Sequence, residues 1–292
     1  MPRPNSDRRP LRVLEASALG MCFGVRDALA IAREVSDPRQ VTIHGELVHN
    51  EQVLAELRQS GFVASPESDR RLPTTERVLV TAHGISDRER RRLATAGKQL
   101  IDTTCPLVQR VHEAARQLAA STDLVVILGR PGHVEVRGLT DDLTRCVVVE
   151  HPEDVATWLA RRLGVVCQTT LPPRRARDLL DAIRTRNPLA DVRFVDTICE
   201  PTKQRQQAAE AVAAEADAVV VIGGEHSNNT RELTLLCERL GTPAHQVQTA
   251  EDLDPTWFTD CATVGVTAGT STPESTVRAV VAALGRIATG RS

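Results

Sequence analysis

The sequence predicts an α/β protein made of three similar units, each a mostly parallel sheet with helices on its faces. Runs rich in valine, isoleucine and leucine alternate with amphipathic helical patterns along the whole chain of 292 residues. This alternation is typical of parallel α/β architecture. Sequence landmarks also recur along the chain, which indicates an internal repeat of about 85 to 95 residues. The expected fold class is therefore α/β, with three pseudo-equivalent units.

Six short apolar runs are the expected buried strands, because each is rich in β-branched residues and bounded by polar or turn-forming residues. They are residues 41–43, 78–80, 124–128, 165–167, 218–222 and 264–266. Between them, apolar residues recur at helical spacing, which predicts amphipathic helices. These helices are expected at residues 25–35, 109–119 and 204–216.

The internal repeat is centred on three cysteines. Residues 101–105 and 195–199 both read as a strand end followed by Asp-Thr-x-Cys, before a helical pattern. Gly129 and Gly223 follow these two cysteines at the same distance, and Gly45 follows Cys22 at nearly that distance. Each copy also ends a later strand in a small polar loop. Because ligands bind at the carboxyl ends of parallel strands, three units facing one another would bring the thiols and loops to a common centre.

The repeat predicts the domain organisation. Residues 1–10 are rich in proline, arginine and aspartate and read as a short disordered tail. The three units are expected at residues 11–104 with Cys22, at 105–198 with Cys105, and at 199–292 with Cys199 and a C-terminal segment. A strand near residues 11–15 is expected to open the first unit.

Composition excludes several classes of partner. The 36 basic and 38 acidic side chains give a net charge of −2, which provides no electrostatic footprint for nucleic acid or an acidic membrane. Aromatic residues make up only 2% of the chain, so base-stacking platforms are disfavoured and the cores must be aliphatic. No apolar run approaches the roughly 20 residues of a membrane helix, and the N-terminus lacks the apolar region of a secretory signal. We therefore expect a cytoplasmic protein.

The cysteine pattern points to reduced thiols or a metal rather than disulfides. Seven cysteines are an odd number, and no Cys-x-x-Cys pair occurs, which weighs against a disulfide framework, zinc ribbons and redox pairs. The four cysteines outside the repeat are expected to be small core residues: Cys146, Cys167, Cys237 and Cys261.

The three repeated cysteines are the candidate metal ligands, because they share one structural position. Three thiolates without a fourth protein ligand suit a [4Fe–4S] cluster with one open iron. Zinc held by three cysteines and a histidine is the competing interpretation. Pro106 after Cys105 suits the first turn of a helix, whose dipole favours a thiolate.

Polar loops follow several of the predicted strands and contain histidine, glycine, serine and asparagine. Backbone N–H groups and hydroxyls at such turns can bind phosphate without lysine or arginine. No P-loop or Gly-x-Gly-x-x-Gly occurs, so a nucleotide is not indicated. Taken singly, each loop is also compatible with ordinary turn and capping chemistry. Glu135, two residues after His133, is a candidate general acid.

With these residues assembled, the sequence resembles the 4-hydroxy-3-methylbut-2-enyl diphosphate reductases, the LytB/IspH family, over residues 13–283. The resemblance rests on a series of short motifs in the family's order. They occupy residues 20–25, 48–50, 82–84, 102–106, 132–135, 168–170, 196–199, 227–230 and 266–271.

The resemblance implies a trefoil of the three units around a central iron–sulfur cluster. It implies that Cys22, Cys105 and Cys199 hold one [4Fe–4S] cluster, whose fourth iron is open to the substrate's hydroxyl group. It also implies that Glu135 donates protons and that Thr169 orients the substrate and relays protons. The positions that match diphosphate-binding residues are His49, His83, His133, Ser227, Asn229 and Ser271, with Asn228 beside them.

The implied reaction is a two-electron, two-proton reductive dehydroxylation of an allylic alcohol, which gives isopentenyl and dimethylallyl diphosphates. A Lewis-acidic iron and a nearby carboxylic acid together would let hydroxide leave as water. Electrons are expected from a ferredoxin or flavodoxin, because no flavin or nicotinamide motif is present.

Three positions depart from the family pattern. Val134 stands where a proline usually separates the histidine from the glutamate, Asn228 replaces a common second serine, and Met21 replaces a phenylalanine. A paralogue acting on a related diphosphate therefore stays open as an interpretation. An aconitase-like iron–sulfur hydro-lyase and a non-catalytic protein with a three-cysteine metal site are also compatible with the cysteine pattern.

Overall fold

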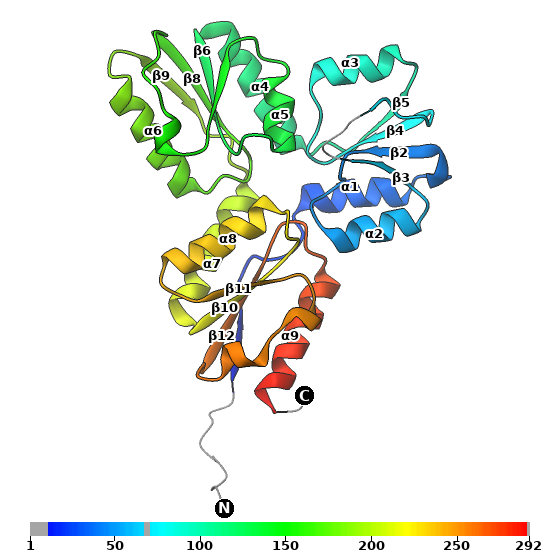
Figure 1. Ribbon diagram of the computed structural model, residues 1–292, viewed down its shortest axis with the longest axis vertical. Coiled ribbons are helices and arrows are strands. Elements are labelled where there is room, and N and C mark those ends of the chain that lie inside the picture. The colour runs from blue at the N-terminus through cyan, green and yellow to red at the C-terminus, as the bar shows by residue number, and fades with distance from the viewer. Residues whose placement is uncertain (1–10, 67–70, 291–292) are drawn as a thin grey trace, which may run out of the picture. The chain divides into compact units, whose positions relative to one another are not determined.

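A computed structural model describes residues 11–66 and 71–290, shown in Figure 1. The tail predicted at residues 1–10 lies outside these described residues. The chain divides into two compact units. Residues Cys22–Lys203 form one, here called the central unit, and the described residues up to Met21 and from Gln204 onward form the other, here called the terminal unit.

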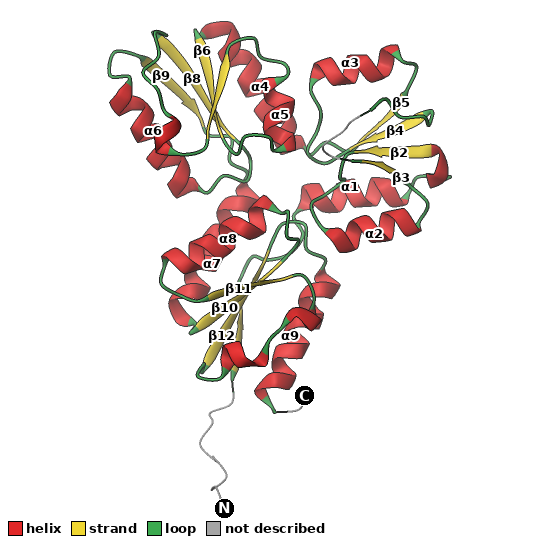
Figure 2. Ribbon diagram, in the orientation of Figure 1, coloured by secondary structure: helices red, strands yellow, loops and turns green. Residues whose placement is uncertain are grey.

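The central unit contains two sheets, and the first is formed by β2 (Val41–His44), β3 (Val63–Ser65), β4 (Arg77–Val80) and β5 (Gln99–Asp102). All its strands run parallel in the order β3-β2-β4-β5. Figure 2 shows the helices that alternate with these strands. They are α1 (Phe23–Arg33), the 3-10 turn η1 (Pro38–Gln40), α2 (Glu51–Gln59) and α3 (Asp87–Thr95).

The second sheet of the central unit repeats this pattern. Its strands are β6 (Leu124–Leu128), β7 (Cys146–Val149), β8 (Arg162–Cys167) and β9 (Asp191–Val195). They are parallel in the order β7-β6-β8-β9. The accompanying helices are α4 (Pro106–Ser121), α5 (Val134–Thr140), η2 (Pro152–Asp154) and α6 (Pro173–Arg186).

The terminal unit contains the third parallel sheet, of β1 (Arg12–Glu15), β10 (Ala218–Ile222), β11 (Ala244–Val247) and β12 (Thr263–Ala268). Its order is β1-β12-β10-β11. The helices are α7 (Glu200–Glu215), which begins at the end of the central unit, then α8 (Asn228–Arg239), η3 (Ala250–Asp252), η4 (Pro255–Phe258) and α9 (Glu274–Ala288).

The prediction of three parallel α/β units is confirmed, and all six predicted strands lie within observed strands. One element differs from the expected organisation. The strand predicted to open the first unit, β1, pairs with β12 and so belongs to the sheet of the C-terminal third. There it occupies the edge position that β5 and β9 hold in the other two sheets. Cys22, Cys105 and Cys199 therefore follow the corresponding edge strands β1, β5 and β9.

The interiors of the units are aliphatic, as the scarcity of aromatic residues predicted. Central strands such as β10 are buried along their whole length. Phe62 and Phe258 are the only buried phenylalanine or tryptophan side chains among the described residues. Parallel strands covered on both faces favour such continuous Val/Ile/Leu runs. No helix in the described part of the chain is long and apolar enough to cross a membrane.

Candidate functional site

The three repeated cysteines lie at helix N-termini of the central unit. Cys22 caps α1, Cys105 caps α4 with Pro106 as the first helical residue, and Cys199 directly precedes α7. The first backbone N–H groups of a helix have no intrahelical acceptor, and the macrodipole places positive charge there. Each helix start therefore favours a thiolate, which is the form of cysteine that binds metal.

The helix that follows Cys22 packs directly against Cys105. A Cβ atom at Gly24 would lie 2.5 Å from the Cys105 sulfur, so only glycine allows this approach. Burial is the main cause of the raised pKa of Cys105, and it raises the pKa of Cys199 to about 11. The neighbouring Cys22 thiol raises the pKa of both further. Burial therefore favours the protonated forms of Cys105 and Cys199, so metal insertion at these thiols must release protons,.

The donor set formed by these thiols suits an iron–sulfur cluster better than a single ion. Among the described residues, no three His, Cys, Asp or Glu side chains are grouped closely enough to hold one metal ion. The iron atoms of a cluster bind their thiolates at separate corners, so the ligands of a cluster need not converge on one point. Three thiols from three helix starts, with no fourth protein thiol among them, fit such a group.

The remaining four cysteines pack in the cores, as predicted. Cys167 and Cys237 are fully buried, while Cys146 and Cys261 are partly buried against core clusters. Burial raises the pKa of Cys237 to about 11. All seven cysteines are free of disulfides.

His49, His83 and His133 come together in the central unit, where the loops after β2, β4 and β6 carry them. The rings of His49 and His83 stack with centroids 4.2 Å apart. The His133 ring meets them edge-on, with centroids 5.4 Å from His49 and 5.9 Å from His83. These loops lie at the carboxyl ends of their strands, where parallel sheets bind ligands.

His133 is arranged to donate a hydrogen bond from its neutral state. Burial, helped by the neighbouring His49, lowers the pKa of His133 to about 3. His133 Nδ1 accepts the backbone N–H of Glu135 at 3.2 Å, which places the ring proton on Nε2. His49 Nδ1 lies 2.9 Å from a carboxylate oxygen of Glu46. A neutral imidazole N–H can bind an anion without a buried positive charge.

Glu135 and Thr169 are joined by two hydrogen bonds within the central unit. The Glu135 side chain is only 1% exposed, and its Oε1 accepts the backbone N–H of Thr169 at 2.7 Å. Its Oε2 lies 2.8 Å from the Thr169 hydroxyl. Burial outweighs these hydrogen bonds and raises the pKa of Glu135 to about 7. The carboxyl group therefore holds a proton near neutral pH, which is what a general acid requires.

Val134 stands between His133 and Glu135, and the hydrogen bond between these two residues forms across it. It is buried as the first residue of α5, which His133 caps. A proline there would be pre-organised for a helix start, but valine also allows the bond between Glu135 N–H and His133.

Ser227, Asn229 and Ser271 lie in the terminal unit, at the carboxyl ends of β10 and β12, and all three are buried. Ser227 caps α8 by accepting the Thr230 N–H at 3.3 Å. The Asn229 side-chain oxygen accepts the Thr270 N–H at 3.1 Å, which ties the loop after β10 to the loop after β12.

A buried side-chain donor in this loop pair has the chemistry to bind an anion. The Asn229 Nδ2 group is buried and has no hydrogen-bond partner within the described residues. Leaving a buried donor unsatisfied is costly, so its presence at a helix N-terminus indicates a place for an acceptor such as a phosphate oxygen. The backbone approaches closely here, since a Cβ at Gly223 or Gly269 would lie 2.2 Å from the Thr230 hydroxyl.

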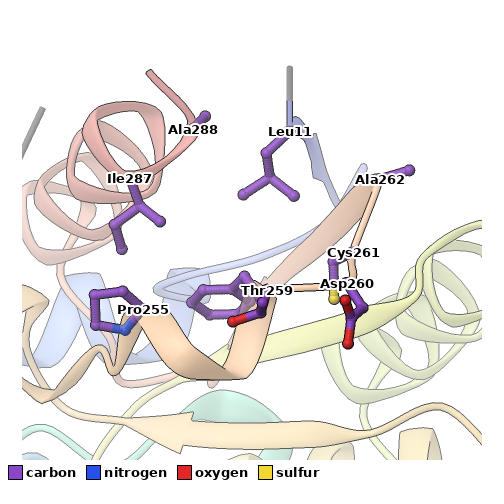
Figure 3. Close-up of a pocket in the computed structure, with 9 residues that line it drawn as sticks. Leu11, Pro255, Thr259, Asp260, Cys261, Ala262, Ile287 and Ala288 are labelled. Atoms are coloured by element: carbon purple, nitrogen blue, oxygen red, sulfur yellow. The ribbon is translucent and has the colours of Figure 1, made fainter. Parts of the chain in front are cut away.

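A cavity of about 380 Å³ lies elsewhere in the terminal unit and contains none of the predicted site residues. Figure 3 shows it beside Leu11, which precedes β1, and Ala262, which precedes β12. It therefore opens at the amino ends of these strands, whereas Ser227 and Ser271 follow the carboxyl ends of theirs. We assign it no part in the candidate site.

Two interactions near the site were missed by reasoning from sequence. His44, which is fully buried, places Nε2 2.7 Å from Glu89. Burial acts to raise the Glu89 pKa, but hydrogen bonds from Arg92 and His44 lower it. In the terminal unit, the buried Arg205 donates to the Gly20 carbonyl, just before Cys22. No sequence motif predicts either pairing, because the partners are far apart in the chain.

Comparison with known proteins gives a consistent result. The family model described as "LytB protein" matches residues 13–285. A protein from Mycobacterium bovis named 4-hydroxy-3-methylbut-2-enyl diphosphate reductase 2 is 37% identical over 93% of this chain and 85% of its own length. One from Aquifex aeolicus named 4-hydroxy-3-methylbut-2-enyl diphosphate reductase is 32% identical over 96% of this chain and 98% of its own.

The fold is also similar to a solved structure. The E-1-hydroxy-2-methyl-but-2-enyl-4-diphosphate reductase from Plasmodium falciparum superposes with a TM-score of 0.86 and 25% sequence identity. The match covers 93% of this chain and 87% of that one.

Proposed function

The chain belongs to the LytB protein family, and from this premise we propose how its residues carry out the family's reaction. Its activity is that of a 4-hydroxy-3-methylbut-2-enyl diphosphate reductase, the terminal enzyme of the non-mevalonate pathway. A reductase consumes external electrons, and the family is one of iron–sulfur enzymes.

The observation that carries the proposal is the buried Glu135, which is hydrogen-bonded to Thr169 and lies two residues after His133 of the histidine cluster. A carboxyl group with a pKa of about 7 keeps its proton at working pH and can still release it,. The carboxyl group is hydrogen-bonded to the Thr169 hydroxyl, through which the proton can be relayed. No other described carboxyl group combines this burial with the same neighbours.

We propose that Cys22, Cys105 and Cys199 hold one [4Fe–4S] cluster with an open fourth iron. When bound, such a cluster supplies electrons and a Lewis acid for a leaving hydroxyl group. The helix starts at Cys22 and Cys105 stabilise the thiolates electrostatically. The Thr202 hydroxyl, 3.1 Å from the Cys199 sulfur, stabilises the third by hydrogen bonding.

The proton transfers are assigned to Glu135 and Thr169. The substrate's C–O bond breaks as Glu135 donates a proton to the oxygen, which leaves as water. Two electrons and a second proton complete the reduction at carbon. Once ionised, Glu135 accepts hydrogen bonds from the N–H and hydroxyl of Thr169, so the residue that relays the proton also stabilises the charge that remains.

The diphosphate is assigned to imidazole, hydroxyl and amide donors. His49, His83 and His133 supply imidazole N–H groups, and the loops of the terminal unit supply hydroxyls and amides. These loop residues are Ser227, Asn228, Asn229 and Ser271. Backbone N–H groups at the start of α8 add to them,.

The remaining assignments are also proposals. The boundaries between the three α/β units are placed at residues 104/105 and 198/199. A ferredoxin or flavodoxin delivers the electrons. The protein acts in the cytoplasm, where its seven free cysteines stay reduced,.

The pH dependence of kcat/KM should follow the ionisation of Glu135. Because only its protonated form donates, we expect kcat/KM to fall about tenfold per unit as pH rises above about 7,. His133, with a pKa of about 3, should add no acidic limb above about pH 5. Measuring kcat/KM from pH 5.5 to 9 tests this. A profile that stays level to pH 9, or one that is unchanged in Glu135→Gln, would contradict the assignment.

Loss of a donor from the terminal unit should weaken substrate binding. A hydrogen bond to a multiply charged oxyanion is worth about 1.5–3 kcal/mol, so Ser227→Ala or Asn229→Ala should raise KM by about one to two orders of magnitude. Steady-state kinetics under anaerobic conditions measure this.

Ser86→Ala is the matched control for this experiment. Ser86 also caps a helix, α3, by accepting the Glu89 N–H at 3.0 Å, but it is outside the assigned diphosphate residues. It should lose similar helix stability, about 1 kcal/mol, with an unchanged KM. Equal effects of the Ser227 and Ser86 variants on KM would show that capping alone is responsible.

The proposed function is tested by comparing the diphosphate substrate with the corresponding alcohol that lacks the diphosphate. We expect reductive conversion of the diphosphate and little conversion of the alcohol at the same concentration. Equal kcat/KM values for the two compounds would show that the loops do not bind a diphosphate.

A further inference from the structure

Three side chains at the start of α8 form a connected chain beside the diphosphate loop. Arg231 Nη2 lies 3.3 Å from the Asn228 side-chain oxygen and 3.1 Å from Glu232 Oε1. Asn228 is the first residue of α8 and follows Ser227 directly. The three residues lie within the terminal unit, so their arrangement is part of one compact body.

The contact with Arg231 determines which end of the Asn228 amide is a donor toward the loop. An amide carries an acceptor oxygen and a donor NH₂ group on the same planar carbon. With the oxygen directed at the guanidinium, the NH₂ group occupies the opposite position. The reversed amide would direct its oxygen at an anionic ligand and repel it. A serine at this position would need no such orientation, because its hydroxyl can rotate.

The same arginine also compensates a buried acid. The Glu232 side chain is 1% exposed, whereas that of Arg231 is 38% exposed. A carboxylate near the start of the helix would oppose the binding of an anion at that end, because like charges repel. The ion pair with Arg231 offsets this charge, so the loop carries no net charge from the pair.

We propose that Arg231 is a positioning residue for diphosphate binding: together with Glu232 it holds the Asn228 side chain with its NH₂ group as the donor. This inference rests on the proposed function, because it deepens the assignment of the same loop. It also explains how asparagine substitutes for a hydroxyl residue at Asn228. In this proposal the pair acts through Asn228.

The test is a double-mutant cycle on the full-length, anaerobically prepared protein, with inorganic diphosphate as the probe. The combined change Arg231→Ala with Glu232→Gln removes the pair without changing net charge. It is made in the native sequence and in an Asn228→Ser background. Calorimetry gives the Kd of inorganic diphosphate, and steady-state kinetics give KM and kcat for the substrate. Arg239→Ala, on the last turn of α8, is the control for loss of an arginine from this helix at a distance from the loop.

In the native background we expect Kd and KM to rise about tenfold with kcat changed less than twofold. In the Asn228→Ser background the same pair of changes should alter Kd less than twofold, since contacting residues are non-additive when one acts through the other. Equal increases in both backgrounds would overturn the inference and indicate that the pair binds the anion directly.

Asn228→Asp gives a second, nearly isosteric test. With one oxygen held by Arg231, its other oxygen would replace the NH₂ group, so we expect a loss of diphosphate affinity of at least about a hundredfold. Asn228→Ser should lose much less affinity than Asn228→Asp, because the serine hydroxyl can rotate to donate to the anion. Wild-type affinity in Asn228→Asp would overturn the orientation inferred for the amide. If the native protein itself failed to bind inorganic diphosphate, the proposed function would fall as well, which distinguishes that outcome from failure of the Arg231 inference alone.

Discussion

Glu135→Gln should lower kcat by about 10²–10⁴-fold, the usual range for loss of general acid catalysis. Glutamine keeps the shape of the side chain and its bonds to Thr169, but it has no acidic proton to donate. The iron and sulfide content, the visible spectrum and the affinity for inorganic diphosphate should remain close to those of the native protein. Turnover is measured anaerobically with dithionite and a mediator, so that electron delivery does not limit the rate.

Two variants delimit this effect. Thr169→Ala should lower kcat in the same direction but less, because the threonine relays or orients rather than holding the proton. Glu153→Gln, in the exposed η2 turn, is the matched control and should turn over normally. If Glu135→Gln kept full turnover with dithionite, the proton donor would have to be another group.

Replacing Cys22, Cys105 or Cys199 by serine should abolish the stable cluster, and with it the reductase activity. A serine hydroxyl is a hard ligand that stays protonated, whereas iron–sulfur clusters are held by soft thiolates. Iron and sulfide analysis after anaerobic purification, together with the visible spectrum, measures the loss. The native protein should contain about four irons and four sulfides per chain and should bleach in air.

Cys146→Ser is the matched control, since Cys146 lies in β7 away from the helix starts and is only partly buried. Its cluster content should equal that of the native protein. Cys237→Ser should also keep the cluster, although burying the hydroxyl should cost about 1–3 kcal/mol of stability. Stoichiometric zinc in the native protein, without charge-transfer absorption, would overturn the cluster assignment.

Most of the fold could be predicted from sequence because its central strands are continuous apolar runs. Residues 218–222 are buried along their whole length. Such a continuous apolar run is typical of a central strand in a parallel sheet. The edge strands β3 and β11 were missed because they are short and partly exposed. The placement of β1 was also missed. Its pattern shows that it is a strand, but pairing with β12 closes a sheet between the two ends of the chain.

The candidate site was predicted to the extent that its residues fall in recurring motifs. His49 and His83 follow β2 and β4 of one sheet, and parallel topology brings the loops after these strands to one edge,. His133 follows β6 of another sheet, so strand order alone does not predict its contact with the other two. The pairing of Glu135 with Thr169 depends on a contact across 34 positions, which only the family resemblance suggested. Arg231 lies outside every motif identified in the sequence. Its role depends on a side-chain contact that sequence spacing does not specify.

The central claim is that this chain is a reductase that needs external electrons and acts on a diphosphate. It is tested most directly by incubating anaerobically purified protein with 4-hydroxy-3-methylbut-2-enyl diphosphate, with and without a reductant, and identifying the products. We predict isopentenyl and dimethylallyl diphosphates only when the reductant is present, with two electrons consumed per molecule of substrate. Conversion of the substrate without any reductant would contradict the account and identify a hydro-lyase instead.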